Sequence, residues 1–238
     1  MTEETEAVGA GPRTSDDVLD NPVWATLVGG AHAGFAQRHG RAARYEPDVA
    51  PFVALADYAD PRAWEDLAEL LGPDEHAAVF GITQWPDDWK PVWAGEGMQM
   101  VGGGVQARPE PEAVLLGTED VPEILDLVAR TEPGPVRERT VELGSYLGIR
   151  RDGKLVALAG ERLRPPGWTE ISAVCTDPEY RGQGLAGRLI RAVAAGIAAR
   201  GDTPFLHVAG TNTNAIRLYH ALGFEQRRAT TFTLLAKA

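Results

Sequence analysis

A glycine-rich turn before an amphipathic segment is the feature that most limits how this chain can fold. Residues 169–177 read as a strand, residues 185–200 carry apolar residues at helical spacing, and residues 203–209 read as another strand. This succession predicts a parallel crossover within a mixed sheet. Gly182 and Gly184 precede the helix, where glycine costs stability unless the backbone needs a conformation that other residues avoid.

The composition of this turn indicates an anion site. The glycines let the backbone turn tightly, so that successive N–H groups can point to one place, and the helix adds its free N–H groups and its positive dipole end. Arg181 can add a charge-assisted contact. A P-loop is excluded, because no Lys-Ser/Thr pair follows the second glycine, and a dinucleotide fold is disfavoured because the turn follows an antiparallel meander. The turn therefore predicts a pyrophosphate cradle.

A second glycine- and proline-rich stretch, residues 102–112, has no apolar periodicity and predicts a linker or long loop. It divides the chain into an N-terminal α/β domain of residues 19–108 and a second domain of residues 112–238. Residues 1–18 are polar and acidic and predict a disordered leader.

The N-terminal half is predicted more coarsely. Asn21-Pro22 can cap a helix that runs to about Arg38, and Asp60-Pro61 begins a second helix that stops before Gly72. Residues 76–82 predict a buried strand, and the Trp- and Pro-rich residues 84–93 predict an irregular segment. The cluster of tryptophans in that segment is attributed to packing.

The C-terminal half has sharper patterns. The Asp-Gly pair at residues 152–153 predicts a hairpin, and the predicted order is β-α-β-β-β-α-β-α-β. The remaining elements are a strand at 113–117, a helix from 120 to about 131, a loop at 131–144, a helix at 214–222 and a closing strand at 225–236.

Two motifs in this half resemble a known family. Residues 181–186 read RGQGLA, like the R/Q-x-x-G-x-G/A pyrophosphate motif of the GNAT superfamily of N-acetyltransferases, and residues 212–224 read NTNAIRLYHALGF, like its N-x-x-A-x-x-L-Y-x-x-x-G-F segment. The resemblance covers residues 112–238 and is greatest to glycine N-acyltransferase-like proteins. It implies an α/β (α+β) GNAT fold, a mostly antiparallel mixed sheet flanked by helices. By analogy, the N-terminal half is a degenerate copy, without a second cofactor motif.

The resemblance also implies the site. Acyl-CoA enters a gap between strands 170–176 and 203–209, the Val174 N–H binds the thioester carbonyl, and Tyr219 protonates or stabilises the departing thiolate. Packing of the Tyr219 ring on the sheet is the alternative for that residue. The implied cofactor-binding residues are Val174, Cys175, Thr176, Arg181, Gly182, Gln183, Gly184, Leu185, Ala186, Gly187, Asn212, Asn214 and Tyr219.

The amine must arrive neutral, which favours a nearby base. Glu170 lies four residues before Val174 on the same face of the strand, and Glu161 ends the preceding strand. These two residues and water remain open as the base, and a solvated or acceptor-binding carboxylate without base function is an equal alternative for Glu170. Cys175 and His207 are interpreted as packing residues.

These features predict an acetyl-CoA-dependent N-acyltransferase that acetylates a primary amine by direct attack in a ternary complex. The alternative is a non-catalytic acyl-CoA-binding sensor. The formal net charge of -11 argues against sequence-independent binding of nucleic acid. The N-terminus lacks a signal-peptide pattern and no apolar run is long enough for a membrane helix, so a cytoplasmic protein with no membrane partner is expected. No metal is expected, and a homodimer is a further prediction.

Overall fold

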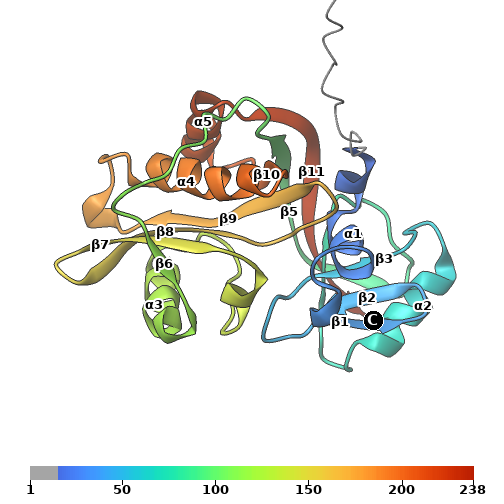
Figure 1. Ribbon diagram of the computed structural model, residues 1–238. Coiled ribbons are helices and arrows are strands. Elements are labelled where there is room, and N and C mark those ends of the chain that lie inside the picture. Colours follow the sequence, from blue (N-terminus) through green and yellow to red (C-terminus); the bar gives the residue numbers. More distant parts are fainter. Residues whose placement is uncertain (1–15) are drawn as a thin grey trace, which may run out of the picture.

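The computed structural model describes residues 16–238 and is built around one eight-stranded sheet (Figure 1). The strands lie in the order β4-β11-β5-β10-β9-β8-β7-β6. Most neighbours in this sheet are antiparallel, and β9 and β10 form its parallel pair. Residues 1–15 of the predicted leader, 1–18, lie outside the described residues. The strands are β4 (Ala77–Phe80), β5 (Trp89–Val101), β6 (Val114–Leu116), β7 (Tyr146–Arg151), β8 (Lys154–Glu161), β9 (Trp168–Thr176), β10 (Thr203–Ala209) and β11 (Glu225–Lys237).

Helices cover both faces of this sheet. Figure 1 shows α4 (Leu185–Ala199) and α5 (Thr213–Leu222) on one face and α3 (Val121–Thr131) on the other. The α4 face carries the largest cluster of buried apolar side chains, in which Leu189, Val193 and Ile197 pack against the sheet. The helical spacing of these residues is what the sequence showed, and their burial holds α4 in place. Short 3-10 helices occur at Asp16–Asp20, Ala33–Phe35, Thr118–Asp120, Thr140–Leu143 and Pro178–Tyr180.

The N-terminal residues form a small layer beside the large sheet. Its three-stranded antiparallel sheet contains β1 (Ala36–His39), β2 (Ala42–Tyr45) and β3 (Val53–Leu55), and its helices are α1 (Pro22–Val28) and α2 (Pro61–Leu70). A bridge between Phe52 and Ala78 connects this layer to the large sheet. The idea that this half is a degenerate copy of the C-terminal fold stays a prediction.

Two predictions for the N-terminal half are wrong. The helix expected at 22–38 ends at Val28, because Gly29 and Gly30 follow and the chain turns back. A Cβ at Gly30 would come within 2.8 Å of the backbone of Ala25 and Arg164, so only glycine fits there. The segment expected to be irregular, 84–93, includes the start of β5, whose pairing with β11 extends back to Trp89.

The fold class and the order of elements after residue 112 are confirmed. The large sheet nevertheless crosses the linker-like segment 102–112, because β4 and β5 come before it and β6 to β11 come after it. No helix in residues 16–238 is long and apolar enough to cross a membrane.

Candidate active site

A cavity opens where the two parallel strands part. Pairing between β9 and β10 is limited to three residue pairs, the last of which is Phe205 with Glu170. Beyond that pair β9 stays on β8 and β10 stays on β5, so the two strands diverge. The cavity has a volume of about 770 Å³, within the range of ligand sites in proteins. Its lining includes residues 171–176 of β9 and 207–209 of β10.

β9 carries a bulge beside this cavity. Leu158 of β8 pairs with Cys175 and Gly160 with Ser172, so that two β9 residues lie opposite one β8 residue. Ala173, within the bulge, has a positive φ of 54°, which is strained for a residue with a side chain. A bulge leaves part of the backbone outside the ladder. Val174 lines the cavity, so this backbone is available to a ligand there.

The glycine-rich turn lies at the rim of the cavity. Gly182 and Gly184 have φ values of 80° and 74°, a backbone conformation that glycine adopts freely. Gly184 caps α4, whose first N–H groups have no partner within the helix. Arg181 and Ala186 line the cavity, and Arg181 Nε donates to the Thr176 carbonyl at 3.3 Å. The structure thus brings the predicted cradle and the strand gap together.

Of the predicted cradle residues, only Arg181 and Ala186 are among those that line the cavity; Gly182, Gln183, Gly184, Leu185 and Gly187 are not. The Leu185 side chain is buried in the core on the α4 face. Gln183 is exposed. Gly187 faces α5, and a Cβ there would lie 3.6 Å from Leu218 and 3.7 Å from Leu222, which is ordinary contact. Gly187 therefore has no steric need to be glycine.

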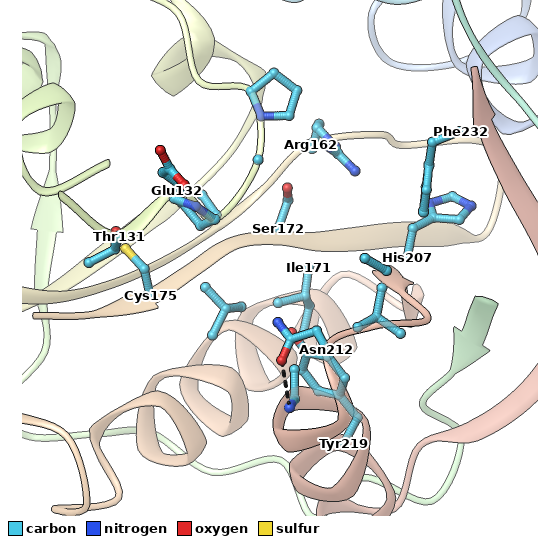
Figure 2. Close-up of a pocket in the computed structure, with 18 of the residues that line it drawn as sticks. Thr131, Glu132, Arg162, Ile171, Ser172, Cys175, His207, Asn212, Tyr219 and Phe232 are labelled. Carbon is cyan, nitrogen blue, oxygen red and sulfur yellow. Dashed lines mark hydrogen bonds between the residues drawn. The ribbon is translucent and has the colours of Figure 1, made fainter. Parts of the chain in front are cut away.

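Helix α5 supplies the opposite wall of the cavity. Asn212 caps the helix by accepting a hydrogen bond from the Ala215 N–H at 3.1 Å, and Asn214 accepts one from Arg217. Both asparagines and Tyr219 line the cavity, and Figure 2 shows Asn212 and Tyr219 there. Burial raises the pKa of Tyr219 to about 12, so the phenol keeps its proton at neutral pH. Tyr219 can therefore donate a proton or a hydrogen bond to a group in the cavity.

Cys175 and Thr176 line the cavity at the end of β9. Burial raises the pKa of the Cys175 thiol to about 11, so the thiol is not poised to act as a nucleophile. The buried Thr176 hydroxyl oxygen has no hydrogen-bond partner among the described residues.

Glu170 does not have the surroundings of a base. It is fully buried and does not line the cavity. Burial opposes its ionisation, but the Arg162 guanidinium binds both carboxylate oxygens, at 2.8 and 2.6 Å, and lowers the pKa of Glu170 well below its ordinary value. A carboxylate held in this way is a poor proton acceptor. The alternative of a solvated or acceptor-binding carboxylate does not describe Glu170 either, because the side chain is fully buried against Arg162 and lies outside the cavity lining.

Glu161, the other predicted base, is also out of reach of the cavity. Its side chain is buried and accepts a hydrogen bond from Arg200 at 2.8 Å. Arg200 is the C-terminal cap of α4, so Glu161 ties the end of β8 to that helix. Its position at a strand end could be seen in the sequence, but the identity of its partner could not.

Several cavity residues were not singled out from the sequence. Among them, Figure 2 shows Thr131 and Glu132 on one side of Ser172, and Arg162 and Phe232 on the other. Glu132 is the one carboxylate that lines the cavity among residues 16–238. The apolar wall beside Arg162 takes residues from the N-terminal layer and from β4 and β11, namely Phe52, Phe80 and Phe232. These phenylalanines lie far from Arg162 along the chain, so no local sequence pattern predicted that they would share a cavity with it. Within residues 16–238, no cluster of His, Cys, Asp and Glu side chains is suited to hold a metal ion.

Comparison with known proteins gives a family match and several relatives. The model of the FR47-like protein family matches residues 146–233. A protein of Novosphingobium aromaticivorans, assigned to the GNAT family of acetyltransferases, has a crystal structure that superposes with a TM-score of 0.84 at 44% identity, covering 92% of this chain and 98% of that one.

Two curated relatives come from mycobacteria. The N-alpha-acetyltransferase RimI of Mycobacterium tuberculosis is 36% identical over 102 residues, 40% of this chain and 63% of the relative. An uncharacterised protein of Mycobacterium leprae is 29% identical over 217 residues, 77% of this chain and 59% of the relative. The chain therefore spans about three fifths of each of these relatives.

Proposed function

This chain belongs to the GNAT family of acetyltransferases, and from that premise we propose that it transfers an acetyl group from acetyl-CoA to the nitrogen of a primary amine. The observation that carries the proposal is the gap between β9 and β10, with the glycine-rich turn at its rim and Tyr219 in its wall. The name of the mycobacterial relative, an N-alpha-acetyltransferase, supports an amine as the acceptor. The likeness to glycine N-acyltransferase-like proteins and the homodimer both stay predictions.

In the proposed complex, the backbone around the Ala173 bulge binds the thioester. The Val174 N–H donates to the thioester carbonyl, whose oxygen gains negative charge as the amine attacks. The N–H groups after Gly182, with Arg181, bind the pyrophosphate. Asn212 and Asn214 contact the pantetheine arm. Transfer is direct, because the one thiol that could take up the acetyl group, Cys175, has a raised pKa.

Two protons move in this reaction. The nitrogen of the amine gives up a proton as it bonds to the acetyl carbon, and we assign that proton to Glu132, which lines the cavity and forms no ion pair within the described structure. The bond between the carbonyl carbon and sulfur then breaks, and Tyr219 gives its phenolic proton to the CoA thiolate. The raised pKa of Tyr219 means that this proton is present before the reaction begins.

Replacement of Tyr219 tests this assignment. Tyr219→Phe removes only the hydroxyl, so we expect kcat to fall by about a hundredfold or more, with little change in the dissociation constant for acetyl-CoA. Thiol release from acetyl-CoA measures the rate with an amine panel, and calorimetry measures the affinity. Tyr180→Phe is the matched control, because Tyr180 lies outside the cavity lining, and it should leave both quantities unchanged.

Two results would contradict the proposal. If the wild-type chain binds acetyl-CoA but releases no thiol with any amine, the chain is a binding protein rather than an enzyme. If Tyr219→Phe keeps the full rate, another group protonates the thiolate. A titration that found two acetyl-CoA molecules per chain would contradict the prediction of one cofactor site.

A further inference from the structure

Arg162 has hydrogen-bonding capacity that its buried partner does not use. Its Nε and Nη2 atoms donate to the two oxygens of Glu170, so one edge of the guanidinium is occupied. A guanidinium has five N–H donors in a fixed plane. The donors at the end of this group, on Nη1 and on the outer side of Nη2, have no hydrogen-bond partner in residues 16–238. Because Arg162 lines the cavity, these donors are available to a bound molecule.

A buried chain of hydrogen bonds holds the Arg162–Glu170 pair in place. The Gln99 amide nitrogen donates to the Leu19 carbonyl at 2.8 Å and lies 3.1 Å from His207 Nε2. Arg227 donates to the oxygen of the same amide, which fixes the orientation of the amide. His207 Nε2 is therefore the acceptor, and its Nδ1–H donates to Glu170 at 2.7 Å. His207 therefore positions the Glu170 carboxylate.

Aromatic rings surround Arg162 on the cavity side. Its guanidinium lies 4.9 Å from the centroid of the Phe52 ring and 5.9 Å from that of Phe80. Phe80 also stacks on His207 and packs edge-on against Phe232. This end of the cavity therefore offers apolar surface beside one group of N–H donors (Figure 2).

The charges in the cavity limit which acceptors fit. Glu170 already balances Arg162, so a carboxylate added beside this pair would leave uncompensated negative charge among aromatic rings. A second ammonium group there would lie beside the guanidinium, and no second carboxylate among residues 16–238 lines the cavity to compensate its charge. Glu132, the carboxylate that lines the cavity, can attract one ammonium group. The site thus suits a single amine on an uncharged body.

We propose that the acceptor is a primary monoamine with an uncharged, apolar body that ends in a hydrogen-bond-accepting oxygen, and that Arg162 binds this oxygen. This inference rests on the acetyl transfer proposed above. Val174 and Glu170 are four residues apart on β9 and are separated by the Ala173 bulge, so the Arg162–Glu170 pair lies away from the Val174 N–H. The amine and the oxygen must therefore lie at opposite ends of the acceptor.

Three amines test the proposal on the full chain. Para-methoxyphenethylamine has one amine, an aromatic body and an ether oxygen at the far end of the ring, phenethylamine lacks the oxygen, and spermidine has a cationic body. We expect kcat/KM to be about tenfold higher for the methoxy compound than for phenethylamine, the usual worth of a hydrogen bond from a charged donor, and lowest for spermidine. The KM for acetyl-CoA should be the same with each amine.

Variants at Arg162 separate recognition from folding. Arg162→Lys keeps a positive charge beside Glu170 but lacks the planar group of donors, so within this variant kcat/KM should be the same for the methoxy compound as for phenethylamine. If this variant fails to fold, Arg162→Met combined with Glu170→Met removes both charges of the buried pair and should lose the same preference. Arg150→Lys is the matched control, because Arg150 pairs with Asp120 and Glu123 outside the cavity lining.

The outcomes separate this inference from the proposed function. Turnover that is fastest with spermidine, or a methoxy preference that survives in Arg162→Lys, would overturn the role of Arg162 and leave acetyl transfer standing. If no amine is acetylated, the proposed function fails. Calorimetry with para-methoxyphenethylamine in the presence of CoA then decides the inference alone: binding that weakens in Arg162→Lys supports it, and an absence of binding overturns it.

Discussion

His32 is a buried residue whose charge state affects stability. Its Nδ1 accepts a hydrogen bond from the Tyr45 hydroxyl at 2.9 Å, and its Nε2–H donates to the Leu143 carbonyl at 2.9 Å. Burial lowers the pKa of His32 to about 4, so the folded protein holds the imidazole neutral at a pH where the unfolded chain begins to protonate it.

This shift predicts a loss of stability in mild acid. Between pH 6.5 and pH 4 the unfolded chain binds more protons than the folded protein at this site, so the free energy of unfolding falls as the pH falls. The contribution is about 3 kcal/mol across that range, measured by urea unfolding at a series of pH values. His32→Gln should lack this part of the pH dependence, and His76→Gln, at an exposed histidine, should keep it. Equal pH dependence in all three proteins would refute the prediction.

Glu170 shows what a single residue's position in the sequence can and cannot predict. The alternation along residues 170–176 correctly placed it on the strand beside the gap. It could not reveal that Arg162, eight residues earlier, pairs with it, since that contact depends on the turn between β8 and β9. Asn212 and Tyr219 were easier to predict, because the motif at residues 212–224 carries them at fixed spacing, and the structure places both in the cavity wall together with Val174.

At the scale of an element, the turn before α4 distinguishes two kinds of glycine. Gly184 has a positive φ at the cap of the helix, whereas Gly187 lies inside the helix with room for a methyl group. Gly184→Ala should lower the free energy of unfolding by about 1–2 kcal/mol and raise the KM for acetyl-CoA. Gly187→Ala should raise the free energy of unfolding by up to about 1 kcal/mol, the difference in helix propensity, and leave that KM unchanged.

Thermal unfolding and steady-state kinetics of the two glycine variants check this contrast. Each variant adds one methyl group within the same turn and helix, so each is the matched control for the other. An equal rise in the KM for acetyl-CoA in both variants would mean that Gly187 itself approaches the pyrophosphate closely, as the sequence motif implied.

Elements whose signals are local were the most predictable. Helices α2 to α5 and the hairpin of β7 and β8 follow from capping residues, apolar spacing and the Asp-Gly turn. The segment 22–38 was mispredicted because Leu27, Ala31 and Phe35 have helical spacing, although Gly29 and Gly30 interrupt the helix and residues 36–39 pair with β2. The strand β5 was not predicted because its proline and its two tryptophans read as irregular, while its partner β11 comes more than a hundred residues later.

For the whole molecule, β5 decides whether the two halves can be separated. It lies between β10 and β11 in the large sheet, with pairs that run from Trp89 to Val101. Met100 of β5 is fully buried in the core under α4, and Gln99 joins the buried hydrogen-bond chain that reaches Arg162. The sequence indicated a division near residues 108–112, but the sheet and the cavity both take residues from each side of it.

This arrangement predicts that residues 109–238 do not fold alone. Without β5, the facing edges of β10 and β11 lose their backbone partners and the core under α4 opens to water, and unpaired buried backbone groups are costly. The fragment should show no cooperative thermal unfolding and no binding of acetyl-CoA. The control is the full chain with a protease site inserted in the exposed segment 106–109 and cut after folding. The cut halves should stay together and still bind acetyl-CoA, since the contacts across the cut persist. A fragment 109–238 that unfolds cooperatively and binds acetyl-CoA would instead make the C-terminal half an independent domain.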